Sequence, residues 1–537
     1  MSKIGLRAAR SILENYQNEA EKESKKVDFG YLEQYSAPLD YCPFEEEYNC
    51  DPAYPYRTYD GTCNNYKYPW WGKSHSPLKR LLTPAYDDYL NEPRSKSVSG
   101  AGLPNPRLIA MKIHAPRDEY SKFSNLVPHF AQFVDHDCTL TSLTSNYQGE
   151  PINCDCEDKN PECINIKTPK EDKLNKDQDC MVTPRSGATY RKLDCKLGHR
   201  EQLNMLTHYL DMSQIYGSDI EKNLGLRTLK GGLLNSTTNK INKKAYLPID
   251  QNKKGTCANV KKGVPCFMSG EIRINQNLLL SSIHTVFLRE HNRVAGLLAE
   301  QNPDWSDEKV FQETRRIIIG EYQHVVYNQW LPVLVGKRAH KLYGLMPLNQ
   351  GYFLKYDQKL YPSISNEFAT AAFRFGHTLI RPTMTQADVK YRKIHESALR
   401  DIVFNPSNAF KHGGIDSYIR GCVMEGTNKY DRHINDHLNN HLFEDLNDKI
   451  PTHRFSLSSL NVNRGRDHGL PGYNHYRALC GLNYANDFDD LYNMPKETRM
   501  KMKEVYAHVD DIDLFTGGIG ELSIEGGVVG PTFACKF

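Results

Sequence analysis

The chain has 537 residues, and 39% of them are hydrophobic, which is enough to build a substantial buried core. Its 68 basic and 65 acidic residues leave a formal net charge of only +3, without a long run of Lys or Arg. The charge therefore excludes a strong electrostatic attraction to nucleic acid. No segment reaches the roughly 20 consecutive apolar residues that a membrane-spanning helix needs.

The N-terminal hundred residues are rich in Tyr, Pro, Asn and charge and show little periodicity. We expect them to wrap a core, with residues 1–40 as an N-terminal extension and one domain over residues 41–537. Met1–Asn15 contains basic residues but lacks the apolar stretch of a secretory leader. If the protein is secreted, we expect its leader to be absent from this sequence.

The fourteen cysteines are informative because many of them lie in short, turn-rich clusters. In an oxidising compartment such cysteines pair and staple long loops. The alternative is a set of reduced or metal-binding thiols, although the spacings do not form two C-x2-C pairs of the zinc type. We therefore expect disulfide-bonded loops and an extracellular protein.

The clearest helical periodicity covers Leu278–Glu300, Lys309–Val335 and Glu367–Ile380. Strand signals are short and scattered. Residues 148–196 are polar and cysteine-bearing, which indicates a stapled surface excursion. No internal repeat and no Pro- or Gly-rich linker divides the chain. The sequence thus predicts one large, mainly α domain with few short strands.

A first candidate site is a segment in which Gln132, Asp135 and His136 fall on one helical face. These three side chains can point into one cavity. Asp137 is rotated by about 100° from His136 and can serve a different site. The alternative is a solvated helix end with an ordinary acidic and histidine cluster, and the Asp-His-Asp triplet alone does not decide between the two.

A second candidate site has oxygen-bearing residues at alternate positions of an expected loop, namely Thr207, Tyr209, Asp211 and Ser213. Alternate positions can turn hydroxyl, carbonyl and carboxylate oxygens toward one hard cation such as Ca²⁺. The spacing is not that of an EF-hand. On composition alone, a turn rich in Ser, Thr and Asp is the simpler interpretation.

Two further candidates are expected on helices: Arg273 with Gln276 and Asn277, and Arg374 with His377. The glycine before His377 would give a flat macrocycle access to the backbone and the imidazole. A lone histidine on an apolar helix is more often a satisfied core residue. The two interpretations both remain open at this stage.

A fifth candidate, residues 460–469, is dense in hydrogen-bonding groups. Asn461 can fix the second ring nitrogen of a ligating histidine, which is the kind of outer support that metal sites need. Arg464 follows one helical turn later. The segment therefore complements a histidine ligand elsewhere in the chain.

Taken together and in this order, these five segments resemble the animal haem peroxidases. The resemblance runs from Tyr56–Asn65 through His284–Asn292 to Gly530–Cys535. It covers about nine tenths of the chain, which makes chance agreement of so many spaced motifs negligible. Within the family the chain looks most like the arthropod chorion peroxidase and peroxinectin branch.

The resemblance implies a role for each polar residue of the cavity. By this resemblance His136 is the distal acid–base residue, Gln132 a distal hydrogen-bonding group and Arg273 the distal arginine. His377 is then the proximal ligand of the haem iron, and Asn461 is its hydrogen-bonding partner.

The resemblance also implies how haem b is held. Arg374 and Arg464 correspond to arginines beside the haem propionates. Asp135 and Gln276 stand where the family usually has two carboxylates that esterify the haem, and an amide is a poor candidate for that bond. We therefore expect attachment through Asp135 only, or none. Asn277 stands where one member has a haem-bonded methionine, so the very high oxidising power of that member is not expected here.

The family's calcium site corresponds to oxygen-bearing residues behind the distal helix: Asp137, Thr207, Tyr209 through its carbonyl group, Asp211 and Ser213. The resemblance also implies five cysteine pairs: Cys50–Cys63, Cys154–Cys163, Cys156–Cys180, Cys257–Cys266 and Cys480–Cys535. It leaves four cysteines unassigned: Cys42, Cys138, Cys195 and Cys422. The chain stops two residues after Cys535, where relatives continue, so we expect a truncated C-terminal end.

The implied reaction is the reduction of hydrogen peroxide, with phenols, protein tyrosines, or ions such as iodide and thiocyanate as reductants. A neutral His136 takes a proton from peroxide and returns it to the leaving oxygen, while Arg273 stabilises the developing charge. The alternative is an adhesive or matrix-organising protein on the same scaffold, although the chain has no Arg-Gly-Asp sequence. A cyclooxygenase is excluded because Arg374 occupies the position of its radical-bearing tyrosine.

Overall fold

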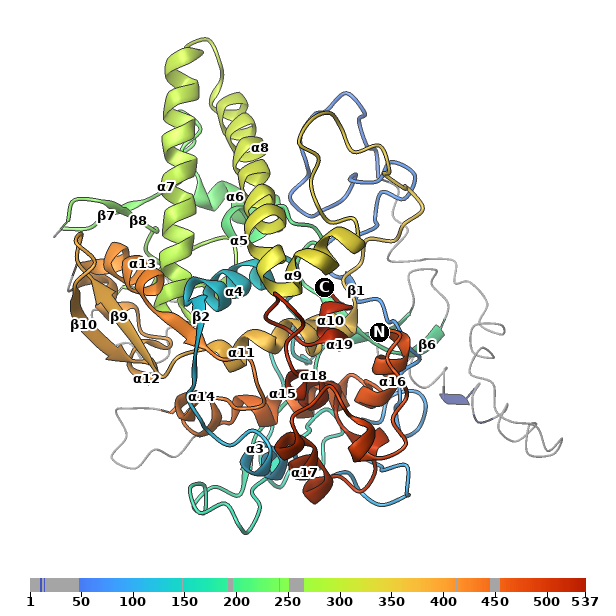
Figure 1. Cartoon of the computed structure of the whole chain (residues 1–537). Helices are drawn as coiled ribbons and strands as arrows, with labels where there is room; N and C mark the ends of the chain where they lie inside the picture. The colour runs from blue at the N-terminus through green and yellow to red at the C-terminus, as the bar shows by residue number, and fades with distance from the viewer. Residues whose placement is uncertain are drawn as a thin grey trace.

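In the computed structural model, helices form most of the molecule and the strands are short (Figure 1). The structure describes residues 48–146, 148–191, 197–240, 242–250, 265–411, 413–444 and 454–537, together with residues 10, 11 and 14. The expected mainly α fold is confirmed. Most of the extension expected at residues 1–40 lies outside the described residues, so the domain boundary at residue 40 stays a prediction.

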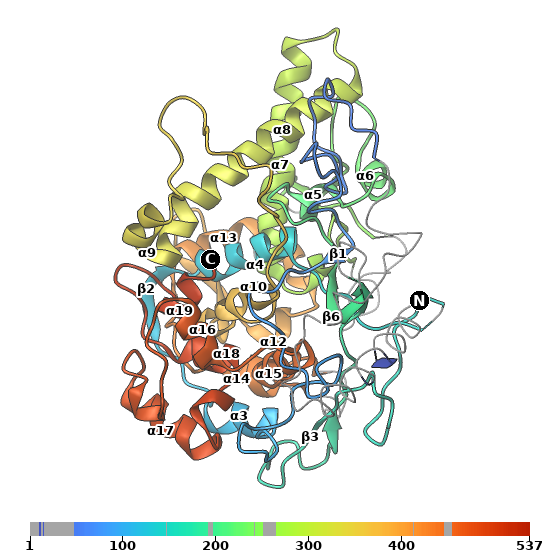
Figure 2. The same cartoon turned by 90° about the vertical axis from the view of Figure 1, so that its right-hand side faces the viewer.

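The two longest helices, α7 (Leu278–Gln301) and α8 (Asp307–Val325), pack side by side and project from the body in both views (Figures 1 and 2). Side chains of an asparagine and a serine cap their N-termini. Helix α8 continues through a π-helical turn (Val326–Trp330) into α9 (Leu331–Leu342). The apolar periodicity thus predicted both ends of α7 and the start of α8 to within two residues. The helix expected to end at Val335 is interrupted at Gly336, whose φ is 71°, and α9 ends at Leu342.

Helix α4 (Leu126–Cys138) lies at the centre of the molecule and packs against α7. Its apolar face includes Phe133, which is fully buried and stacks on Phe287 with the ring centroids 4.9 Å apart. Burying an aromatic side chain of this size contributes roughly 2–3 kcal/mol. This packing fixes the rotation of α4 and hence the direction of the polar residues on its other face.

The segment from 366 to 379 corrects the prediction of one continuous helix over Glu367–Ile380. It divides into three short helical pieces: α10 (Asn366–Thr370), a 3₁₀ turn (Ala372–Phe375) and α11 (Gly376–Leu379). Over so short a span, apolar spacing does not distinguish 3.0 from 3.6 residues per turn. The break lies at Ala371, whose φ and ψ of −132° and −61° are not helical.

The strands form small sheets at the periphery. A three-stranded antiparallel sheet has the order β1–β6–β5, and the other sheets have two strands each. The strands are β1 (Ser76–Pro77), β2 (Tyr120–Ser124), β3 (Ile166–Lys167), β4 (Cys180–Met181), β5 (Ala188–Arg191), β6 (Leu197–Asn204), β7 (Thr237–Thr238), β8 (Ala245–Tyr246), β9 (Thr383–Ala387), β10 (Lys393–Ala398) and β11 (Gly426–Asn428).

Shorter helices complete the body around α4. They are α3 (Pro106–Lys112), α5 (Ser213–Tyr216), α6 (Ile220–Leu226), α12 (Leu399–Ile402), α13 (Gly414–Met424), α14 (Asp436–Asn440), α15 (Leu457–Asp467), α16 (Tyr473–Leu479), α17 (Lys496–Val505), α18 (Leu514–Gly520) and α19 (Pro531–Ala534). None of the helices in the described part of the chain is long and apolar enough to cross a membrane.

Four of the five implied disulfides are present among the described residues: Cys50–Cys63, Cys154–Cys163, Cys156–Cys180 and Cys480–Cys535. The fifth involves Cys257, which lies outside the described residues, as do Cys42 and Cys195. Cys138 and Cys422 are buried free thiols. The expected stapling of long loops is therefore confirmed where the structure describes it.

The stapled excursion over residues 148–196 is only partly at the surface, which corrects the sequence-based expectation. Arg185 is fully buried, and its Nε donates a hydrogen bond to the carboxylate of Asp467 at 2.6 Å. The neighbouring Ser186 lines the central cavity. Polar composition suggested a surface loop because a buried, fully bonded arginine has no signature in a sequence.

Candidate active site

A cavity of about 340 Å³ lies between α4 and the 3₁₀–α11 segment. His136 lines it from α4 and His377 lines it from α11. Arg273 enters from a 3₁₀ turn, Ile272–Asn275, just before α7. The cavity is also lined by other predicted site residues: Gln132, Asp135, Gln276, Asn277, Arg374 and Arg464. Segments far apart in the sequence thus meet around one space.

The distal side, which is the wall formed by α4, is organised by Glu271. One oxygen of this buried carboxylate lies 3.3 Å from Nδ1 of His136. The other accepts a hydrogen bond from Nε of Arg273 at 2.7 Å. Arg273 also donates to the carbonyl of Thr139 at 2.7 Å and lies 3.5 Å from the Asp135 carboxylate. The guanidinium and the imidazole are therefore held by one carboxylate.

Burial and nearby charges set the protonation states of His136 and Glu271. Burial lowers the pKa of His136 below its usual value, the Arg273 guanidinium lowers it further, and Glu271 opposes both. Burial alone would raise the pKa of Glu271, but Arg273 and His136 outweigh it and hold that pKa at about 2. The arrangement at neutral pH is a neutral imidazole beside a charged carboxylate.

Three amide side chains line the next part of the distal wall. Gln132 donates a hydrogen bond from Nε2 to Oε1 of Gln276 at 3.0 Å, and its own Oε1 accepts one from Asn277 at 2.6 Å. Asn277 also caps α7 by accepting from the backbone N–H of Leu280. Gln132 is therefore fixed at both ends of its amide.

On the proximal side, which is the wall formed by α11, the described residues include no carboxylate partner for the histidine. The amide nitrogen of Asn461 on α15 lies 2.9 Å from Nδ1 of His377. Its oxygen accepts a hydrogen bond from Arg374 at 2.8 Å. Burial, followed by the charge of Arg374, lowers the pKa of His377 to about 3. His377 is therefore a neutral imidazole.

The cavity has room for a flat group against α11. A methyl group built on Gly376 meets no atom of the described residues within 4 Å, so this glycine leaves open space next to His377. Burial and the nearby Arg464 lower the pKa of Arg374 to about 10. Arg464 itself donates to Asp467 at 2.7 Å. The two neighbouring guanidiniums form a cationic edge that suits carboxylate substituents.

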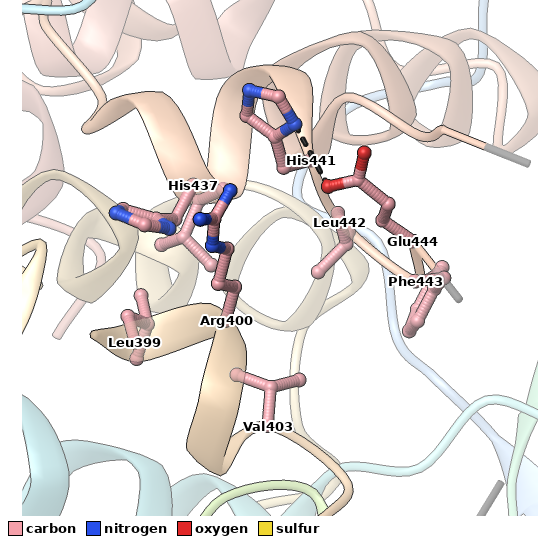
Figure 3. A pocket seen from close by; sticks show the side chains of 9 residues that line it. Leu399, Arg400, Val403, His437, His441, Leu442, Phe443 and Glu444 are labelled. Atoms are coloured by element: carbon pink, nitrogen blue, oxygen red, sulfur yellow. Dashed lines mark hydrogen bonds and ion pairs between the residues drawn. The ribbon is translucent and has the colours of Figure 1, made fainter. Parts of the chain in front are cut away.

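A narrow cleft adjoins the apolar wall of the cavity. The two spaces share Leu399, Val403, Leu438, Leu442 and Phe443. Figure 3 shows the outer side of this wall, where Nδ1 of His441 lies 2.9 Å from the Glu444 carboxylate. Arg400 lies beside His437 on the same side. The wall is therefore apolar toward the cavity and polar toward the cleft.

The predicted calcium residues meet behind α4. Asp137 points away from the cavity, and its Oδ1 accepts hydrogen bonds from the backbone N–H and the hydroxyl of Ser213 at 2.7 and 2.9 Å. Burial, followed by the neighbouring Asp211, raises the pKa of Asp137 well above its usual value. Oδ2 of Asp211 and the hydroxyl of Thr207 are both buried, and the Thr207 hydroxyl lowers the pKa of Asp211 against the effect of burial. Tyr209 donates its hydroxyl to Trp71 at 2.7 Å, which leaves its carbonyl as the group available here.

Sequence reasoning missed two residues of the site. Glu271 lies only two positions before Arg273, but no spacing rule links it to His136. His129 precedes His136 by two helical turns, is buried, and lines the same cavity. Neither of its ring nitrogens has a hydrogen-bond partner among the described residues, and burial lowers its pKa to about 3. The seven-residue spacing, which returns a helix to the same face, was the available signal.

Comparisons with known proteins agree with this geometry. Residues 56–537 match the family model described as animal haem peroxidase. The chain is 35% identical to the peroxidasin homolog pxn-2 of Caenorhabditis elegans over 510 residues, which are 89% of this chain and 38% of that protein. It is also 35% identical to the chorion peroxidase of Drosophila melanogaster over 495 residues, 89% of this chain and 60% of that protein.

Among solved structures, peroxidase A from Dictyostelium discoideum aligns with a TM-score of 0.75 at 28% identity, covering 90% of this chain and 89% of that one. The chain spans about two fifths to three fifths of the length of the curated relatives named above. The family model nevertheless covers almost all of the described residues. The chain therefore belongs to the animal haem peroxidase family.

Proposed function

We propose that the chain is a secreted peroxidase that reduces hydrogen peroxide at a haem b held between His136 and His377. The observation that carries this proposal is the pair of neutral imidazoles, His136 buried and His377 half-buried, on opposite walls of one cavity. Haem, when bound, supplies a redox-active iron that accepts the oxidising equivalents of peroxide. The four disulfides support an oxidising compartment.

His377 is the proposed iron ligand. A ligand must present an unprotonated Nε2, so the ring proton must lie on Nδ1 and needs an acceptor. Asn461 provides that acceptor when its amide turns over, because the oxygen and the nitrogen then exchange positions. Arg374 then gives up its hydrogen bond to this oxygen. Arg374 and Arg464 hold the propionates at the cationic edge. Gly376 leaves the space in which the macrocycle lies against α11.

His136 is the proposed proton carrier. Its neutral imidazole removes a proton from hydrogen peroxide, and the imidazolium that forms is stabilised by Glu271 at 3.3 Å. The same proton is then delivered to the oxygen that leaves as water. Arg273 stabilises the negative charge that develops on that oxygen, and Gln132 orients the peroxide by hydrogen bonding. Glu271 acts as a positioning residue for both.

The proposed reductants are phenols, including protein tyrosines, and ions such as iodide and thiocyanate. The apolar wall with Phe404 and Phe443 suits an aromatic ring at the mouth of the cavity. The alternative function is that of an adhesive, matrix-organising protein with little catalysis. The complete set of distal polar groups favours the enzyme, because adhesion does not require a buried histidine paired with a carboxylate and an arginine.

An absorption spectrum tests this function. We expect the chain, expressed with haem and calcium in an oxidising system, to show a Soret band that shifts on adding stoichiometric peroxide. A phenol or iodide should then restore the original band. A well-folded chain that takes up no haem would instead favour the adhesive function. A bound haem that does not respond to peroxide would contradict the roles proposed for His136 and Arg273.

We further propose a calcium ion at Asp137, Thr207, the carbonyl of Tyr209, Asp211 and Ser213. Two buried carboxylates repel each other unless a cation lies between them. Burial raises the pKa of both carboxyl groups, and the charge of Asp211 raises that of Asp137 further. Oxygen ligands of this number and type suit Ca²⁺. The ion would lock α4 to the start of α5 from behind.

The covalent attachment of haem is expected to be incomplete. The carboxylate of Asp135 lines the cavity and can form an ester, whereas the amide of Gln276 cannot. We therefore expect one haem bond or none in the natural chain. Replacing Gln276→Glu should add a bond, and Gln276→Leu, which removes the amide without supplying a carboxylate, is the matched control.

Mass analysis of the denatured protein counts these bonds. The Gln276→Glu variant should retain more haem after denaturation than the natural chain, after turnover with peroxide. Replacing Asp135→Asn in the natural chain should remove any ester that this chain forms. Two haem bonds in the natural chain, or no gain in the Gln276→Glu variant, would contradict the proposed attachment.

A further inference from the structure

A second cleft, separate from the haem cavity, lies between α8 and the loop that the Cys50–Cys63 disulfide closes. Its volume is about 220 Å³. Nine residues line it: Pro55, Tyr56, Arg57, Gln312, Arg315, Arg316, Ile319, Gly320 and Gln323. None of these nine described residues lines the haem cavity. The cleft is therefore a space of its own.

The charge of this cleft is one-sided. Three of its residues are the arginines Arg57, Arg315 and Arg316, and none of the nine described lining residues carries a carboxylate. The acidic neighbours are engaged elsewhere. Glu313 forms an ion pair with Lys309 at 2.8 Å, and Glu308 is held by another arginine at 2.6 Å. The positive charge of the cleft thus lacks a neutralising partner within its own wall.

Arg315 forms the floor of the cleft. Its side chain is only 3% exposed, and its terminal nitrogens donate to the carbonyls of Arg57 and Thr58 at 2.7 and 3.0 Å. The guanidinium lies over the ring of Tyr59, 4.4 Å from the centroid. Its Nε is buried without a hydrogen-bond partner among the described residues. Burial lowers the pKa of Arg315 and the nearby carboxylate of Asp211 opposes this effect, so the charge is partly compensated. The unused Nε donor still lacks an acceptor, which an anion in the cleft would supply.

The two other arginines lie at the rim. Arg57 and Arg316 are exposed, and Arg57 donates to the side chain of Asn64. Because a planar guanidinium presents several donors in a fixed geometry, a rim and floor of arginines recognise the oxygens of a sulfate, phosphate or carboxylate group. A volume of 220 Å³ exceeds that of a water molecule several-fold and admits such a group.

We propose that this cleft binds an oxyanion, with Arg315 at the floor and Arg57 and Arg316 at the rim. The ligand class is a tetrahedral oxyanion such as sulfate, either free or carried by a sugar. The site lies on the outer face of α8, whereas His136 and His377 line a different cavity. A matrix-bound anion could therefore hold the protein while peroxide and reductant still reach the haem cavity.

Calorimetric titration with inorganic sulfate tests the site. The full chain, expressed with haem and calcium, is titrated at constant ionic strength set with sodium chloride. We expect saturable binding at one site. Replacing the exposed Arg316→Gln should weaken it about tenfold, the loss typical of one hydrogen bond to a charged group. Arg338→Gln, which removes the same charge from an exposed position on α9, should leave the affinity unchanged.

A sulfated disaccharide distinguishes the two sources of the anion. Tighter binding of the disaccharide than of free sulfate indicates a sugar ligand, and equal binding indicates the free ion. Absence of saturable binding by either ligand in the natural chain would overturn the proposal, as would equal weakening by Arg316→Gln and Arg338→Gln.

Discussion

His136 and His377 line the same cavity from opposite walls, yet their partners differ in charge. The carboxylate of Glu271 lies 3.3 Å from His136, whereas the amide of Asn461 lies 2.9 Å from His377. A carboxylate stabilises the protonated ring. The amide of Asn461, together with the guanidinium of Arg374, disfavours the protonated form of His377. The first environment therefore suits a group that holds a proton briefly, and the second suits a group that keeps a lone pair for a metal.

The largest expected effect separates these two roles. Replacing His377→Ala should abolish haem binding, because the proposed iron ligand is removed. Replacing His136→Ala should preserve haem binding but slow the reaction with peroxide by roughly 100- to 10,000-fold, the usual contribution of an acid–base group. The measurements are Soret absorbance per chain and the rate of the spectral change on mixing with peroxide.

A buried histidine outside the cavity provides the control. His114 bonds the carbonyl of Arg432 at 2.8 Å and the hydroxyl of Thr516 at 3.0 Å. His114→Ala should lower the melting temperature without changing the haem content per folded chain. The comparison between the walls fails if His136→Ala loses as much haem as His377→Ala.

A smaller effect is expected from Glu271→Gln, which makes the two walls alike. The charge of Glu271 raises the pKa of His136 against the effects of burial and Arg273. Without that charge the pKa falls further, so His136 stays neutral to lower pH. The acid limb of kcat/KM should therefore move to lower pH. The rate at neutral pH should also fall, roughly tenfold, because Arg273 loses its anchor.

The pH profile of kcat/KM for peroxide measures this shift. Glu201→Gln is a matched control, because Glu201 is also buried and forms an ion pair, with Arg80 at 2.7 Å, away from the distal histidine. It should leave the acid limb in place. An acid limb that stays fixed in Glu271→Gln would show that another group controls it.

The two walls also differ in how much the sequence revealed. The histidines and Arg273 stand in dense polar motifs, and their order along the chain matched a known family, so both walls could be predicted in outline. Glu271 could not, because its contact with His136 spans 135 positions and depends on how the 3₁₀ turn before α7 is placed. Long-range side-chain contacts leave no periodic trace.

The sequence also did not reveal whether the backbone before His377 winds as an α-helix or as a 3₁₀ turn. The sequence predicted one helix through His377, but the chain tightens into a 3₁₀ turn before α11. The apolar positions are the same in both windings, and the tertiary packing around Phe373 and Phe375 selects between them. The burial of Arg185 in a polar segment has the same origin, since its partner Asp467 is distant in sequence.

The distal wall has a support that the proximal wall lacks, the proposed calcium ion behind α4. Without the ion, Asp137 and Asp211 are two buried carboxylates that repel each other, and with it they are ligands. Calcium should therefore stabilise the folded chain, by about 3 kcal/mol at a free concentration near 100 Kd. We expect the effect of removing calcium to be smaller than the effect of losing haem or of replacing Glu271.

The change in melting temperature caused by Asp211→Asn should have opposite signs with and without calcium. This is the smallest effect we predict. In calcium-depleted protein it removes the repulsion and raises the melting temperature, whereas at saturating calcium it removes a ligand and lowers it. Thermal unfolding of both proteins in both conditions measures the reversal, with the exposed Asp304 replaced by Asn as the charge-matched control. A variant that is less stable in both conditions would indicate that Asp211 serves the fold without a cation, since its hydrogen bond from the backbone of Ser213 at 3.1 Å would then account for the loss.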